Sequence, residues 1–142
     1  MFKTELHAHT AEVSPCAKLK AREVVDAYIA AGYTTLIIAD HFCDYVINNA
    51  GATWQQKIDH YLTGYRRAKE YAGDRLNVLL GVEMRFEGSN NDYLMLGMTE
   101  EFLYNHPEVH KMKLNRFRPF AIQNDMRKSI DVFLYWDALL LP

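Results

Sequence analysis

Short β-rich runs alternate with longer helical patterns over the first hundred residues of the chain. Residues 34–39 (TTLIIA) are rich in β-branched side chains and almost continuously apolar, as expected of a strand covered on both faces. Residues 18–31 carry apolar side chains at the spacing of one helix face, and Gly32 follows as a helix stop. This β-then-α order predicts a largely parallel α/β sheet or barrel with crossover helices, in one domain.

The same alternation continues after residue 50. Thr53 and Gln56 form a capping box, which predicts a helix that runs to Gly73. Residues 77–86 (NVLLGVEMRF) read as a third strand, and residues 92–98 (DYLMLGM) as its return strand after a turn. The sheet is therefore expected to contain at least one hairpin beside its parallel strands.

The last third of the chain is less regular. A short helix is predicted from Thr99, and Pro119 is expected to end or kink one more helix. Residues 127–142 end in an apolar, aromatic run, IDVFLYWDALLLP, which is atypical of a closing surface helix. We interpret residues 1–126 as the folded part and residues 127–142 as a tail produced by a frameshift or a truncation.

Charge and composition exclude several classes of protein. The formal net charge is −2, so no bulk positive field exists to hold a nucleic acid. No apolar run reaches the ~18–20 residues that span a bilayer, and the start lacks the layout of a secretory signal. Two cysteines are too few for a disulfide framework. We therefore expect a cytoplasmic protein with no membrane partner.

Histidines and carboxylates follow three of the predicted strands. His7 and His9 close the first, His41 follows the apolar strand 34–39, and Glu83 interrupts the third. Neutral imidazoles and carboxylates suit a transition metal, and active sites of parallel α/β folds gather at the strands' carboxyl ends. The alternatives are two surface histidines and a Glu83–Arg85 ion pair. The agreement of three strands favours a metal site.

These residues also carry a family resemblance. The motifs HAHT, ADH and GVE resemble, in order and spacing, the first motifs of the PHP (polymerase and histidinol phosphatase) family. The longer segments ELHAHTAEVSPCAK, ADHF, GVEMRF and NDYLMLG resemble a bacterial subgroup of stand-alone PHP proteins. The resemblance covers roughly residues 1–125. It implies a distorted (βα)7 TIM-like barrel with two or three zinc, manganese or iron ions at the strands' carboxyl ends, and phosphoester hydrolysis.

The resemblance also implies a role for each matched residue. His7 and His9 match the metal ligands of the family's first motif, His41 matches the histidine of the second, and Glu83 matches a carboxylate that bridges two metals. Many relatives place a further His or Asp where this chain has Cys16, which would be either a soft thiolate ligand or a small packing residue. Later family motifs, an AHP-like histidine and a DxH pair, are absent. The chain is therefore expected to hold about the first half of the barrel.

The functional hypothesis is a metal-dependent phosphoesterase that acts on a small-molecule phosphate monoester. Asp40 is the catalytic candidate, expected to orient His41 or to accept a proton, with orientation favoured. Arg85 either binds the substrate phosphate or forms a salt bridge. The first alternative is a truncated, inactive remnant that binds metal or self-associates through the unclosed barrel edge. A second alternative is a non-phosphatase metal hydrolase on a related barrel.

The remaining histidines receive no functional role from the sequence. His60 is expected on the surface of an amphipathic helix. His106 and His110 are four residues apart and would share a helix face, but no carboxylate pattern beside them indicates a site.

Overall fold

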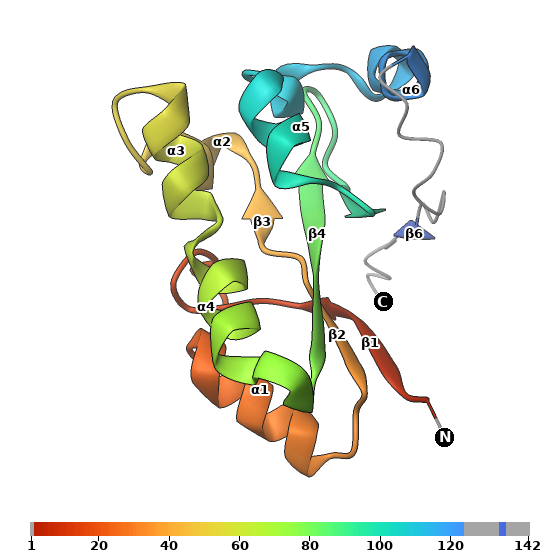
Figure 1. Cartoon of the computed structure of the whole chain (residues 1–142). Coiled ribbons are helices and arrows are strands. Elements are labelled where there is room, and N and C mark those ends of the chain that lie inside the picture. Colours follow the sequence, from red (N-terminus) through yellow and green to blue (C-terminus); the bar gives the residue numbers. More distant parts are fainter. Residues whose placement is uncertain (1, 124–133, 136–142) are drawn as a thin grey trace, which may run out of the picture.

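The computed structural model describes residues 2–123 and 134–135, and in it a curled sheet is packed against several helices (Figure 1). The strands, in sheet order, are β1 (Thr4–Ala8), β2 (Thr35–Ile38), β4 (Asn77–Arg85), β5 (Asp92–Leu96) and β6 (Leu134–Tyr135); β3 (His41–Phe42) pairs with β4 off this path. Strands β1, β2, β3 and β4 form parallel pairs, whereas β5 pairs antiparallel with both β4 and β6. The predicted α/β class and the β4–β5 hairpin are confirmed, and the curl resembles part of a barrel.

The helices connect the strands in the predicted order. They are α1 (Ala21–Ala30), α2 (Asp44–Asn48), α3 (Trp54–Tyr61), α4 (Thr63–Ala72), α5 (Glu100–Asn105) and α6 (Leu114–Gln123), with short 3-10 turns η1 (Gly73–Arg75) and η2 (Val109–Lys111). Gly32 has φ of 75°, a backbone conformation that favours glycine, and it ends α1 as predicted. Thr53 and Gln56 form the predicted capping box of α3, and Thr99 caps α5.

One helix prediction is wrong in detail, and one of the two alternatives for Pro119 is excluded. The single helix expected from residue 53 to Gly73 is divided at Leu62, where the fully buried side chain is part of the core. Pro119 does not end α6, which continues to Gln123. The missing N–H of Pro119 costs one backbone hydrogen bond. Phe117 and Phe120 on the same helix, however, pack against the aromatic rings of Phe86 and Phe102. In both places tertiary packing overrides the local signal.

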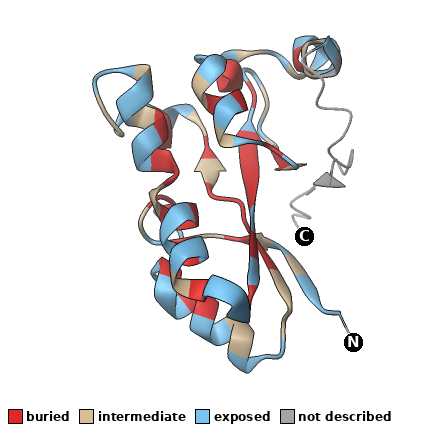
Figure 2. Ribbon diagram, in the orientation of Figure 1, coloured by how far each residue is buried: buried red, intermediate tan, exposed pale blue. Residues whose placement is uncertain are grey.

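The core lies between the sheet and helices α1, α3 and α4, as the buried stripes in Figure 2 show. Along β4, Val78, Leu80, Val82 and Met84 are at most 9% exposed and belong to this core. The alternate residues of β4 lie on the other face of the sheet, because successive side chains of a strand point in opposite directions. Gly81 is one of them, and a Cβ there would lie 2.7 Å from Cγ2 of Ile37, so only glycine fits.

The predicted tail, residues 127–142, lies outside the described residues apart from the backbone of β6. The boundary expected near residue 126 also lies outside the described residues. Within the described part of the chain, no helix combines the length and the apolar character that a membrane crossing requires.

Candidate metal centre

The structure brings the four predicted ligands together on the face of the sheet opposite the core. His7 lies in β1, His9 follows that strand, and His41 in β3 is the register partner of Glu83 in β4. The Glu83 carboxylate contacts all three imidazoles. Oε1 lies 3.4 Å from Nε2 of His7, and Oε2 lies 3.1 Å from Nε2 of His9 and 2.7 Å from Nδ1 of His41.

An irregularity in β1 accompanies this convergence. The register between β1 and β2 shifts between Glu5 and Ala8, as at a β-bulge, and His7 lies inside the shifted stretch. A bulge leaves backbone N–H groups without ladder partners. Here Oε1 of Glu5 accepts hydrogen bonds from the N–H groups of Leu6 (3.0 Å) and His7 (3.1 Å). Glu5 therefore stabilises the local backbone from which His7 projects.

The arrangement of the lone pairs fits a cation. Nε2 of His7 and Nε2 of His9 lie 2.7 Å apart, and the buried Oε2 of Glu83 has no partner in hydrogen-bond geometry. Nitrogen and oxygen ligands about 2.0–2.1 Å from a tetrahedral zinc ion lie about 3.3 Å from one another. The observed separations of 2.7–3.4 Å among these atoms are close to that spacing. Such a donor set suits zinc, iron or manganese.

Electrostatics in the site follow from these contacts. Burial by itself raises the pKa of Glu83, but the contacts with His41, His7 and His9 outweigh it and hold the pKa far below its usual range. The Glu83 carboxylate in turn raises the pKa of His41. These contacts therefore favour the ionised form of the Glu83 carboxylate.

Asp40 has different partners from those expected. Its carboxylate accepts hydrogen bonds from the Thr10 N–H (2.7 Å), the Thr10 hydroxyl (2.7 Å) and the Ser14 hydroxyl (2.6 Å). None of the described hydrogen bonds joins this carboxylate to the His41 imidazole, so any orientation of His41 by Asp40 does not act through the ring, and the alternative of accepting a proton stays a prediction. Asp40 instead acts on the His41 backbone, whose N–H donates to Oγ of Ser14 at 3.0 Å. It is a positioning residue, 2% exposed, and burial raises its pKa.

Helix α4 and the end of α3 pack against this network of hydrogen bonds. The Tyr61 hydroxyl donates to the Asp40 carbonyl oxygen at 2.8 Å. Gly64 lies so close that a Cβ there would be 1.9 Å from Oγ1 of Thr10 and 3.0 Å from Oδ2 of Asp40. The division of the predicted helix at Leu62 therefore occurs next to the residues that contact this loop.

Arg85 forms a salt bridge, one of its two predicted roles, but with Asp92 rather than Glu83. The guanidinium contacts the Asp92 carboxylate at 2.7 and 2.5 Å, and the two residues are register partners in the β4–β5 hairpin. Asp92 also lies within ligand distance of His41 and Glu83. The sequence places Asp92 at the start of the return strand without a functional role; the strand pairing, once its register is known, places it beside the site.

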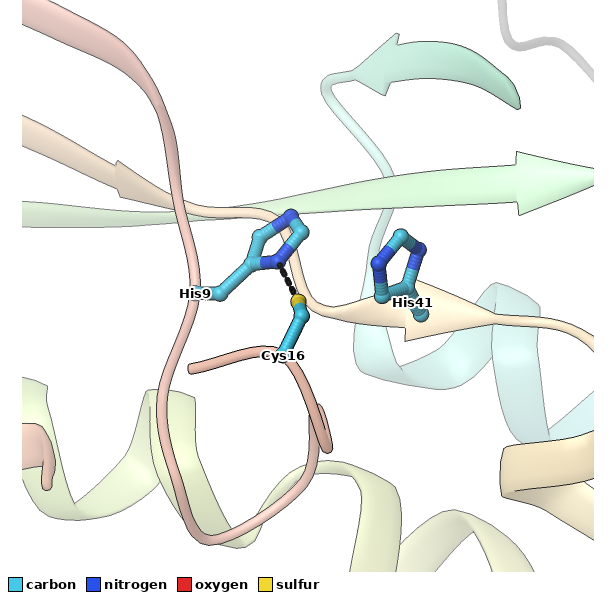
Figure 3. A group of neighbouring side chains, drawn as sticks. All are labelled: His9, Cys16 and His41. Atoms are coloured by element: carbon cyan, nitrogen blue, oxygen red, sulfur yellow. Dashed lines mark hydrogen bonds between the residues drawn. The ribbon is translucent and has the colours of Figure 1, made fainter. Parts of the chain in front are cut away.

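Cys16 is an exposed residue of the loop after β1, so the role of a small packing residue does not fit it. Its Sγ lies 3.1 Å from Nδ1 of His9, with His41 nearby (Figure 3). The order Cys16–His9–Glu83 also has the connectivity of a nucleophilic triad. Desolvation and the Glu83 and Asp40 charges raise the pKa of Cys16, however, which disfavours the thiolate that a nucleophile needs.

A pocket of about 340 Å³ opens beside two of the four ligands, His7 and Glu83. Its lining also includes Asp92, Leu6 and Leu94. A volume of this size suits a small molecule rather than a polymer.

His110 was expected to share a helix face with His106, and the structure instead places it in the 3-10 turn η2, buried in the core. It is 2% exposed, its ring stacks on Trp54, and its Nε2 lies 3.1 Å from Oδ1 of Asp44. Burial lowers the pKa of His110 despite this carboxylate. The pair lies sixty-six positions apart in the sequence, so no local pattern indicated it.

No model of a known protein family matches the chain, and no curated protein matches it closely enough to count as a relative. The case for a metal centre therefore rests on the geometry described above and on the motifs that carry the resemblance.

Proposed function

We propose that the chain is a metal-dependent phosphoesterase of the PHP type, built on the first part of a distorted (βα)7 barrel. The observation that carries this proposal is the convergence of three imidazoles on one buried carboxylate beside parallel strands. The resemblance of the HAHT, ADH and GVE motifs to those of the PHP family indicates the reaction class. The chemistry of the donor set supplies the cofactor, a divalent zinc, manganese or iron ion.

The residues of the chain have separate tasks in this proposal. His7, His9 and Glu83 would hold one ion, and His41 would contribute to a second. When bound, such an ion would supply Lewis-acid chemistry, polarising a phosphoryl oxygen and lowering the pKa of bound water towards ~7. Asp40 keeps the loop after β1 and the backbone of His41 in place, which preserves the spacing of the donor atoms.

The proposed substrate is a phosphate monoester of a small molecule. The pocket beside His7 and Glu83 is small, and the net charge of −2 offers no track for a nucleic acid. Arg85 lies on the same strand face, two residues beyond Glu83, and its side chain is about half exposed. It is a candidate for the phosphate contact if it exchanges Asp92 for the substrate, a geometry that a guanidinium favours.

The test combines metal analysis with hydrolysis of p-nitrophenyl phosphate in the presence of zinc, manganese or ferrous ions. Stoichiometric metal and turnover that His9→Ala abolishes would support the enzyme. The matched control is His60→Ala, because His60 is exposed on α3 and touches none of the ligands. Metal without turnover would favour the alternative of an inactive metal-binding remnant. Turnover that survives His9→Ala would contradict the proposal.

Self-association is a separate proposal, carried by the outer edge of β1. Strand β1 is the first in the sheet order, so its outer edge has no strand partner among the described residues. Leu6 in this strand is 36% exposed, and an exposed apolar edge promotes strand pairing between chains. Sedimentation velocity should show a dimer or larger species that Leu6→Lys reduces. A monomeric wild-type chain at high concentration would contradict it.

A further inference from the structure

The face of the sheet that carries Glu83, here called the inner face, is apolar away from the metal centre. Leu79 and Leu96 alternate along β4 and β5 with residues of the core, so they lie on this face and outside the core. Together with Leu6 and Ile37 they line a hollow of about 810 Å³. Leu6 and Leu79 are 36% and 42% exposed. An apolar hollow with exposed leucines is typical of a docking surface.

The opposite face of the same hairpin is already covered. Tyr93 and Met95 of β5 belong to the core. The Tyr93 ring packs against Phe86, which in turn packs against Phe117 of α6. A segment that reaches this edge of the sheet therefore meets accessible apolar side chains on the inner face and not on the core face.

The backbone of β6 brings such a segment to the hairpin. It pairs antiparallel with β5, with Leu134 opposite Leu94 and Tyr135 opposite Tyr93. Strand β6 therefore runs toward the end of the hairpin at which Asp92 pairs with Arg85. The chain leaves β6 at the edge of the sheet where the inner face carries the metal centre.

Residues 136–142 follow β6 and lie outside the described residues. Their sequence is WDALLLP, in which every side chain except that of Asp137 is apolar. Two residues that reverse the direction leave five, which span about 16 Å when extended. Leu96 is four residues from Asp92, or about 13 Å along the strand. The segment is therefore long enough to pass Leu96 and to bring its last side chains to Leu79.

We propose that residues 136–142 dock on the inner face of their own chain, with the leucine side chains in the hollow beside Leu6, Leu79 and Leu96. Removal of apolar surface from water drives this contact. Asp137 lies in the reversal at the polar edge, so docking buries no charge. In a closed barrel, side chains fill the interior, and the docked segment takes their place. The inference depends neither on metal binding nor on hydrolysis.

Tryptophan fluorescence of the metal-free full chain tests this contact. The chain has two tryptophans, so in Trp54→Phe the emission comes from Trp136 alone. We expect its maximum at a shorter wavelength than in the same chain unfolded in urea, because a docked indole is shielded from water. Leu79→Asp, made in the Trp54→Phe chain, should move the maximum back toward the unfolded value. Circular dichroism checks the fold of each variant.

Leu19→Asp is the matched control, because Leu19 is 45% exposed and lies outside the hollow. It should leave the emission of Trp136 unchanged. A maximum equal to that of the unfolded chain, or one that responds no more to Leu79→Asp than to Leu19→Asp, would overturn the proposal. A shift that appears only as the concentration rises, together with a dimer in sedimentation velocity, would assign the inner face to a second copy and also overturn it.

A second measurement does not require Trp54→Phe to fold. A photoreactive benzophenone amino acid replaces Leu79 in the otherwise unchanged chain, and trypsin digestion after irradiation identifies its neighbour. Residues 129–142 contain no Lys or Arg, so trypsin releases them as one peptide. We expect this peptide joined to position 79 in material that migrates as a monomer, and no such product when Leu19 is replaced instead. A cross-link between chains, or none to residues 136–142, would overturn the proposal.

Discussion

The two faces of strand β4 border regions of different chemistry, an apolar core and a cluster of polar side chains. On one face, Val82 and Met84 are fully buried in the core against the helices. On the other face, Glu83 is also buried, at 8% exposure, but meets three imidazoles instead of hydrocarbon. The core face is stable as it stands, because apolar burial is favourable without any ligand. The Glu83 face instead buries a carboxylate whose contacts are three imidazole nitrogens, and this set of donor atoms suits a bound cation.

This difference predicts that neighbouring substitutions on β4 have opposite consequences. The largest expected effect is on metal binding. Glu83→Gln replaces the carboxylate that touches His7, His9 and His41 with a neutral amide, and affinity should fall by more than the 10–100-fold that is typical of supporting residues. Calorimetric titration with Zn²⁺ measures the change. Affinity within a factor of two of the wild type would refute the assignment of Glu83.

The matched change on the core face is Met84→Ala. Met84 is 0% exposed, and truncation of a buried Met side chain costs about 2–5 kcal/mol of folding stability. Urea denaturation of the metal-free chain should show this loss, while the affinity of the folded chain for Zn²⁺ stays close to that of the wild type. If Met84→Ala weakens metal binding as much as Glu83→Gln does, the two faces are not independent.

Gly64→Ala tests the coupling between the helices and the ligands. The new Cβ would lie 1.9 Å from Oγ1 of Thr10, so helix α4 or the loop must shift, at a cost of about 1–3 kcal/mol. Since Thr10 is bound to Asp40, metal affinity should also fall about tenfold. Glu70→Ala, an exposed change on the same helix, is the control and should change stability by less than about 0.5 kcal/mol. Unchanged metal affinity in Gly64→Ala would show that the network does not position the ligands.

The smallest expected effect is the pH dependence that arises from His110, away from the ligands. Its pKa is lowered in the folded chain, so below the ordinary histidine pKa of about 6.5 the unfolded chain binds a proton that the folded chain does not. The free energy of unfolding therefore decreases as the pH falls below about 6.5. Denaturation at several pH values should show a weaker acid dependence in His110→Gln than in the wild type. Equal slopes in the two proteins would contradict the sign or the source of the shift.

The sequence predicted those parts of the site that depend on strand order. His7, His9, His41 and Glu83 were identified because polar residues that follow parallel strands share one edge of the sheet. The partners of Asp40 could not be predicted in this way, because Thr10 and Ser14 reach it through a loop whose path local propensity does not determine.

Other features required knowledge of register or packing. Asp92 comes close to the site only because the β4–β5 hairpin pairs it with Arg85. The two-residue strand β3 is too short to give any alternating pattern, yet its pairing places His41 opposite Glu83. The division at Leu62 and the continuation through Pro119 depend on side chains distant in sequence, which a propensity argument does not see.

The contact between His7 and Glu83 joins the first strand of the chain to the fourth. An ion held by both side chains is a reversible cross-link across most of the folded sequence, and it exists only when β1, β3 and β4 are all in place. Such a ligand binds the native chain and not the unfolded one, so at one hundred times its dissociation constant it adds about 2.7 kcal/mol to stability. Metal supply would then govern the lifetime of this protein as well as its chemistry.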